Sequence, residues 1–187
     1  GMGGHAAGEV ASSIAVETIA KTAPQSADAA RLAAAVEAAN AAVIEAALNG
    51  LGKPGMGCTA TCAYIENDTL AIAHVGDSRA YLLHEGTLIR VTRDHSYVEE
   101  LVDAGEITAD EARVHPNRSV ITRALGSDPA MYADHFTLHI EEGDRLILCS
   151  DGLSSMIPDS DIENIATQSS TAQICVDNLV DAALAAG

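Results

Sequence analysis

The sequence predicts a single α+β domain built from layers of helices and antiparallel sheet. Helical patterns occupy both ends of the chain, whereas the apolar residues between residues 56 and 149 mostly follow the two-residue period of strands. Helices and strands that come in separate runs are typical of α+β proteins and argue against alternating βαβ units. A length of 187 residues suffices for one such domain with a substantial core.

The helical segments are defined by apolar stripes and by helix breakers. A glycine-rich opening at residues 1–5 leads into the first helix, and Pro24 separates this helix from the second. The second helix carries apolar residues on one side and charged residues on the other, so we expect it to cover a core and not to cross a membrane. The predicted helices are residues 6–22, 26–49, 97–104, 108–115, 160–168 and 171–186.

The predicted strands begin with a hairpin. Residues 58–66 and 69–75 alternate around a turn at Asn67 and Asp68, and the chain continues into a second pair of strands as an antiparallel meander. The last strand contains the apolar run 146–149, which is too short for a helix and predicts burial on both faces. The predicted strands are residues 58–66, 69–75, 80–84, 87–92, 132–140 and 146–149.

Two acidic residues that follow apolar strands are the candidate metal ligands. Asp151 comes just after the run 146–149 and directly before Gly152. Carboxylate oxygens at the end of a strand are suitable donors for a hard cation. Asp77 stands in a similar position after residues 69–75, so the two carboxylates are expected to converge at one end of the sheets. Ordinary Asp-Gly turn chemistry, or a chance pair of surface turns, would also explain these residues.

A polar helical segment interrupts the strands after Asp94. It is predicted to contain two short helices, and the second begins with a capping box formed by Thr108 and Glu111. Pro116 ends that helix. A segment of this kind is either a flap over an active site or a surface excursion.

The charge of the chain excludes some partners. With 27 acidic and 10 basic residues the net charge is -17, whereas a nucleic-acid backbone or an anionic membrane would require a basic face. No secretory signal is visible, and the four cysteines lie in apolar contexts typical of reduced core thiols. The sequence therefore predicts a cytoplasmic protein without nucleic-acid contacts and, in this segment, without membrane contacts. Its excess of carboxylates is compatible with divalent cations.

Six short motifs follow one another along the chain. They are residues 1–5 (GMGGH), 57–60 (GCTA), 75–81 (VGDSRAY), 94–95 (DH), 123–126 (RALG) and 146–153 (LILCSDGL). In order and spacing they resemble the protein phosphatase 2C (PPM-type) family, and the bacterial serine/threonine phosphatase branch of that family fits best. The match extends along essentially the whole chain.

This resemblance implies a four-layer α-β-β-α sandwich of two antiparallel sheets flanked by helices, with a two-metal site of Mn²⁺ or Mg²⁺ at one end. It also implies hydrolysis of phosphoserine and phosphothreonine, so phosphoproteins would be the substrates. By resemblance, Asp151 and Asp77 would be the catalytic metal ligands, Asp151 in the metal pair and both residues around a third, weaker metal. Gly1 would offer its carbonyl oxygen to the pair, and residues 96–125 would form a flap that helps to select substrates.

The chain departs from the family pattern at both ends. The family places an aspartate before the glycine-rich motif, an acidic ligand and a phosphate-binding arginine further upstream, and a Gly-x-Asp-Asn motif after the last helix. None of these lies within residues 1–187. The domain is therefore expected to be truncated, to lack terminal strands, to have little activity by itself and to form homo-oligomers through exposed sheet edges. The alternative function is a catalytically impaired phosphatase-like module that binds partner proteins.

Overall fold

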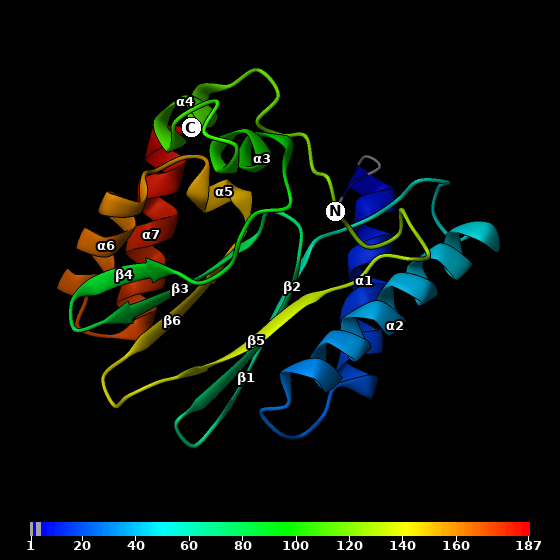
Figure 1. Ribbon diagram of the computed structural model, residues 1–187, viewed down its shortest axis with the longest axis horizontal. Helices are drawn as coiled ribbons and strands as arrows, with labels where there is room; N and C mark the ends of the chain where they lie inside the picture. The colour runs from blue at the N-terminus through cyan, green and yellow to red at the C-terminus, as the bar shows by residue number, and fades with distance from the viewer. Residues whose placement is uncertain (1, 3–4) are drawn as a thin grey trace. The chain divides into compact units, whose positions relative to one another are not determined.

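The chain divides into two compact units, each with its own sheet. The computed structural model describes residue 2 and residues 5–187, and Figure 1 traces the chain. Within these described residues, each unit contains one three-stranded antiparallel sheet with helices packed against it. This confirms the α+β class with two antiparallel sheets flanked by helices. The first unit consists of Gly1–Gly76 and Asp94–Ile140, and the second of Asp77–Arg93 and Glu141–Gly187.

The first unit combines a helix pair, a sheet and a helical insertion. Its elements are α1 (His5–Thr22), α2 (Ala29–Leu48), β1 (Ala60–Glu66), β2 (Thr69–Val75), α3 (Tyr97–Asp103), α4 (Ala109–Val114) and β5 (Asp134–His139). The strand order is β1-β2-β5, and the central strand β2 is almost fully buried. The helix α2 packs against β2 and β5, and α1 packs against α2, as the blue and cyan ribbons of Figure 1 show.

Small side chains allow the helix pair to pack closely. Ala11 of α1 and Ala39 of α2 are fully buried, together with Val36 and Val43 on the same side of α2. Alanine combines the highest helix propensity with a short side chain, so an alanine-rich stripe favours both helix formation and close approach. No helix in the described part of the chain has both the length and the apolar content that crossing a bilayer requires.

Capping side chains set two helix boundaries. The helix α2 begins three residues later than predicted, because the Asp28 side chain accepts a hydrogen bond from the Arg31 amide at 3.0 Å. The predicted capping box of α4 is confirmed: the Glu111 amide donates to Thr108 Oγ1 at 3.2 Å, and the Thr108 amide donates to Glu111 Oε2 at 2.7 Å.

The second unit has its own core. Its elements are β3 (Arg79–His84), β4 (Thr87–Arg90), β6 (Arg145–Cys149), α5 (Asp151–Ser154), α6 (Asp159–Gln168) and α7 (Ala172–Ala186). The strand order is β4-β3-β6, and the core lies between this sheet and the helices α6 and α7. The buried residues of the core are Tyr81, Leu83, Ile157, Ile162, Ala166, Cys175 and Leu179.

The predicted meander is wrong, because the consecutive strands β2 and β3 belong to different sheets. The chain leaves the first sheet at Gly76, whose φ is +110°. A Cβ at Gly76 would lie 2.4 Å from Thr59 Cγ2, so both the backbone angle and the available space require glycine. The alternating pattern predicted the strands correctly but could not indicate which strands pair.

The predicted burial of residues 146–149 on both faces is also wrong. Among the described strands β6 has only β3 as a neighbour, and Leu148 is 46% exposed. Ile147 and Cys149 pack against the core of the second unit from the other face. The apolar run therefore forms an edge strand in which Leu146, Ile147 and Cys149 are half-buried and Leu148 is exposed.

Replacing His84 with glutamine is expected to reduce stability more at acidic than at alkaline pH. The His84 Nδ1 atom lies 2.7 Å from Asp144 Oδ1, and this hydrogen bond raises the pKa of His84 above its ordinary value of 6.5. Because the folded-state pKa exceeds the unfolded one, the contribution of the pair is complete below pH 6.5 and is lost as the pH rises through the folded-state pKa.

Urea unfolding of both proteins across this pH range measures the difference in stability. His135→Gln is the matched control, because the His135 ring makes a long contact of 3.5 Å with the Ala133 carbonyl oxygen and not a short one with a carboxylate. A His84→Gln effect that stays constant with pH, or that grows in alkali, would contradict the expectation.

Candidate functional site

The register of β3 and β6 brings the two candidate acids to the same end of one antiparallel pair. Arg79 of β3 pairs with Cys149 of β6 at the end of the ladder. Asp77 precedes Arg79 by two residues, and Asp151 follows Cys149 by two residues. Because the strands are antiparallel, both acids leave the ladder at the same end, equally far from its last pair. Their role as metal ligands stays a prediction.

Asp151 is the first residue of α5, a short helix that the sequence pattern did not predict. The Ser155 amide donates to the Asp151 carbonyl oxygen at 2.9 Å, and Leu153 packs against the core of the second unit. The backbone at Asp151 is therefore fixed by a helical turn, whereas its side chain is exposed. An exposed carboxylate on a fixed backbone can bind a cation with little rearrangement.

The side chain of Arg79, next to Asp77, takes part in a structural contact. Its Nη1 atom donates to the Tyr81 hydroxyl at 3.0 Å and lies 3.7 Å from Asp159 Oδ1. The Tyr81 hydroxyl donates in turn to Asp159 Oδ1 at 2.8 Å, and burial raises the pKa of Tyr81. These contacts connect the start of β3 to the start of α6. They therefore fix the position of the first residue of β3, two residues after Asp77.

The available donors match a hard divalent cation in type but are few. Asp77 and Asp151 offer carboxylate oxygens, the ligands that Mn²⁺ and Mg²⁺ prefer. Gly1, the third predicted ligand, lies outside the described residues. Within the described residues no group of three or more His, Cys, Asp or Glu side chains is arranged to hold a metal. The two carboxylates thus fit the chemistry of such a site and would supply part of its coordination.

A buried polar cluster in the first unit was not predicted from the sequence. His74 and His95 are 0% and 2% exposed, and their rings stack with 5.0 Å between centroids. His74 Nδ1 lies 2.9 Å from Thr61 Oγ1, and His95 Nε2 lies 2.9 Å from Asp134 Oδ2. The only signal in the sequence was the short motif at residues 94–95, which gave no partner for the histidine.

Family comparison assigns the chain to a class of enzymes. The profile of the family described as protein phosphatase 2C matches residues 1–187, so the chain belongs to the protein phosphatase 2C family. This confirms the resemblance carried by the six motifs and the prediction of an enzyme of this class.

Named relatives and solved structures agree with this assignment. The serine/threonine phosphatase stp of Listeria welshimeri is 38% identical over 172 residues, which cover 88% of this chain and 68% of that protein. The serine/threonine protein phosphatase PstP of Mycobacterium tuberculosis is 43% identical over 168 residues, which cover 87% of this chain and 32% of that protein.

The fold of the chain matches that of solved phosphatases. The crystal structure of M. tuberculosis PstP/Ppp covers 100% of this chain with a TM-score of 0.91 and 39% identity, and the chain covers 80% of that structure. A crystal structure of the PstP catalytic domain in complex with two manganese ions gives a TM-score of 0.88 and 37% identity, and covers 100% of this chain and 79% of its own.

Proposed function

We propose that this chain is a metal-dependent protein serine/threonine phosphatase that hydrolyses phosphoserine and phosphothreonine with Mn²⁺ or Mg²⁺. The observation that carries the proposal is the β3–β6 register, which puts Asp77 and Asp151 at the same end of one strand pair. The support from relatives is that those named above are serine/threonine phosphatases, and that the PstP catalytic domain binds two manganese ions.

In this reaction the residues of the chain would mainly hold the metal ions. Divalent ions, when bound, neutralise the phosphoryl oxygens and activate a water for in-line attack. Asp77 and Asp151 would hold these ions, and the core contacts of Leu153 and Tyr81 would keep the two carboxylates in place. Metal-dependent hydrolysis of this type therefore needs no nucleophilic side chain.

Metal affinity is expected to be low. A cation such as Mg²⁺ or Mn²⁺ takes about six oxygen ligands, and sites with few charged protein ligands bind weakly, with dissociation constants on the order of 10⁻⁴ to 10⁻³ M. Since no larger cluster of ligand side chains exists among the described residues, Mn²⁺ binding by Asp77 and Asp151 falls in this weak class. The prediction of little activity for this chain by itself rests on the same ground.

Phosphate release from a phosphothreonine peptide, titrated with Mn²⁺ from micromolar to tens of millimolar, tests the function. We expect slow release that needs millimolar Mn²⁺, and no release from the matched phosphotyrosine peptide. Release that is independent of metal, or that prefers phosphotyrosine, would contradict the proposal. Peptide binding without any release would support the alternative, a module that binds partner proteins.

A reducing compartment fits the thiols, and we assign the protein to the cytoplasm. None of the four cysteines, Cys58, Cys62, Cys149 and Cys175, forms a disulfide in the part of the chain that the structure describes. Burial raises the pKa of the Cys62 thiol to about 11 and also raises that of Cys58, so these thiols stay protonated and unreactive near neutral pH.

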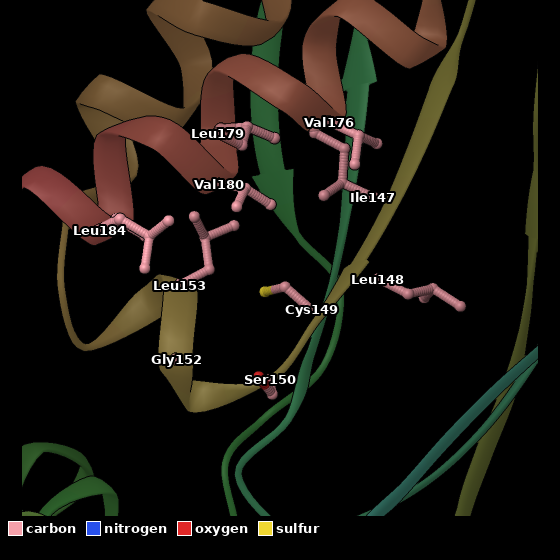
Figure 2. Close-up of a pocket in the computed structure, with 11 residues that line it drawn as sticks. Ile147, Leu148, Cys149, Ser150, Gly152, Leu153, Val176, Leu179, Val180 and Leu184 are labelled. Atoms are coloured by element: carbon pink, nitrogen blue, oxygen red, sulfur yellow. The ribbon is translucent and has the colours of Figure 1, made fainter.

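Self-association through β6 is the second part of the proposal. A groove of about 330 Å³ lies between β6, α5 and α7 in the second unit. Figure 2 shows Val180 and Leu184 of α7 directed toward Leu153, whereas Leu148, at the margin of the groove, extends from β6 on the side away from α7. Because β6 pairs only with β3 among the described strands, a second copy can add its own β6 antiparallel about a two-fold axis.

Light scattering coupled to size exclusion is expected to find a dimer. Replacing Leu148, which is 46% exposed, with lysine should yield a monomer, because a charge on an edge strand opposes edge pairing. Val114→Lys is the matched control, since Val114 is 79% exposed on the insertion and far from any strand edge in sequence. A wild-type monomer at every salt concentration would overturn this part of the proposal.

A further inference from the structure

The helical insertion of the first unit leaves and rejoins the body at one place. Ser96 and Ile121 form an antiparallel bridge, and the Tyr97 amide donates to the Val120 carbonyl oxygen at 3.0 Å. The helices α3 and α4, green in Figure 1, lie between these two roots. Any displacement of the insertion must therefore begin at residues 95–97 and 120–122.

We infer that His95 is a positioning residue that fixes both roots of the insertion, residues 96–121, to strands β2 and β5. The backbone N–H and C=O groups of His95 and its two ring nitrogens make hydrogen bonds to three residues, Gly76, Thr122 and Asp134. The His95 amide donates to the Gly76 carbonyl oxygen at 2.8 Å, and the His95 carbonyl oxygen accepts from the Thr122 amide at 2.9 Å. Its ring accepts from the Gly76 amide through Nδ1 at 2.9 Å and contacts Asp134 through Nε2 at 2.9 Å.

These contacts determine the tautomer of the ring. The Gly76 N–H can donate to Nδ1 only if that nitrogen has a free lone pair, so the ring proton of the neutral imidazole is on Nε2. The Nε2–H group then donates to Asp134 Oδ2. The neutral ring thus makes two hydrogen bonds at once, one to Asp134 on β5 and one to Gly76, the residue after β2.

The Asp134 carboxylate extends the connection to the exit root. Its Oδ1 atom accepts a hydrogen bond from Arg123 Nη1 at 2.6 Å, and the Arg123 guanidinium lies 4.1 Å from the centre of the Tyr132 ring. Burial by itself would raise the pKa of Asp134, but the hydrogen bonds from His95 and Arg123 hold it below its usual range. The ionised carboxylate therefore links the residue before the insertion to a residue just after it.

Packing leaves the His95 ring little freedom to rotate. The ring stacks on His74 at 5.0 Å with an interplanar angle of 29°, and its residue is 2% exposed. His74 lies on β2 and contacts Thr61 of β1 through Nδ1 at 2.9 Å. Because the ring cannot rotate, the insertion roots keep a fixed position relative to strands β2 and β5.

Hydrogen exchange in two complementary variants tests the inference. His95→Gln places an amide near the Nε2 position and retains the contact with Asp134, whereas His95→Asn retains only an acceptor near Nδ1 for the Gly76 amide. We expect the Tyr97 and Thr122 amides to exchange about 10- to 100-fold faster in His95→Asn, with partial rescue in His95→Gln. The amide of Ile72, in the centre of β2, should change by less than about threefold.

The controls separate positioning from general stability. His139→Asn makes the same substitution at an exposed site of β5, where the histidine ring lies 3.5 Å from Asp68. This variant should leave amide exchange at Tyr97 and Thr122 unchanged. Faster exchange by the same factor at Ile72 and at the roots would show a purely structural histidine and overturn the inference, and so would unchanged exchange at Thr122. If His95→Asn does not fold, Asp134→Asn removes the same charged link with the histidine in place and is judged by the same criteria.

The consequence for catalysis rests on the proposed phosphatase function. If the insertion contacts the peptide part of a substrate, His95→Asn should raise KM for a phosphothreonine peptide, whereas KM for p-nitrophenyl phosphate, which has no peptide part, should stay the same. Exchange at the roots requires no turnover. Fast exchange together with absent phosphatase activity would therefore refute the function and leave the positioning role intact.

Discussion

Asp151→Asn is expected to reduce Mn²⁺-dependent phosphate release by about 10²- to 10³-fold, the range seen when one group that stabilises transition-state charge is removed. Asparagine has the shape of aspartate but lacks its negative charge, so the cation loses half of the charge that Asp77 and Asp151 supply. The α5 backbone does not depend on the carboxylate, because the Ser155 amide donates to the carbonyl oxygen of Asp151.

Phosphate release and Mn²⁺ titration calorimetry measure this effect separately from stability. Asp161→Asn makes the same change in net charge at an exposed position in the first turn of α6, and it should leave both quantities unaltered. Stability of Asp151→Asn should stay within about 0.5 kcal/mol of wild type, as is usual for surface substitutions. If the variant bound Mn²⁺ and released phosphate as wild type does, Asp151 would not be a ligand.

Gly126→Ala is expected to destabilise the protein by about 3 kcal/mol or more, the range of overpacked and strained sites. Gly126 has φ +93°, and a Cβ there would lie 2.4 Å from the Met56 carbonyl oxygen and 2.8 Å from Val43 Cγ1. Its amide also donates to the buried Asn40 Oδ1 at 2.7 Å, so the segment cannot shift away from α2 without losing this bond.

Gly143→Ala separates backbone strain from steric overlap. Gly143 has a nearly equal φ of +97°, but a Cβ at this position would meet nothing within 4 Å. Only the cost of a left-handed alanine remains there, about 1–2 kcal/mol. Equal losses in the two variants, measured by urea unfolding, would mean that the contacts with Met56 and Val43 relax freely.

Local patterns predicted most elements of this fold. The hairpin of β1 and β2 followed from alternation around Asn67 and Asp68, and the start of α4 followed from the Thr108 and Glu111 pair. Both signals act between residues close in sequence, where the chemistry of one turn or one cap decides the structure. The pairing of β2 with β5 joins Thr69 to His139, and no local pattern contains that information.

The two candidate sites differ in the same way. Asp77 and Asp151 were found because each follows an apolar strand, a signal contained within a few residues of each acid. The His95 cluster was missed because its partners Asp134 and His74 lie far from it in sequence, and only the folded sheet brings them together. Burial of both histidines likewise depends on packing and not on the residues beside them in the chain.

The β3–β6 register requires a fixed number of residues between Arg145 and Asp151. Deleting one residue of β6 would shift the following residues by one position, so that Asp151 would lie opposite Ser78 and no longer opposite Asp77. The side chains after the deletion would also point to the opposite face of the sheet. The turn at residues 141–143, before β6, can change in length without disturbing this spacing. Insertions and deletions are therefore expected to be tolerated in that turn and selected against between Arg145 and Asp151.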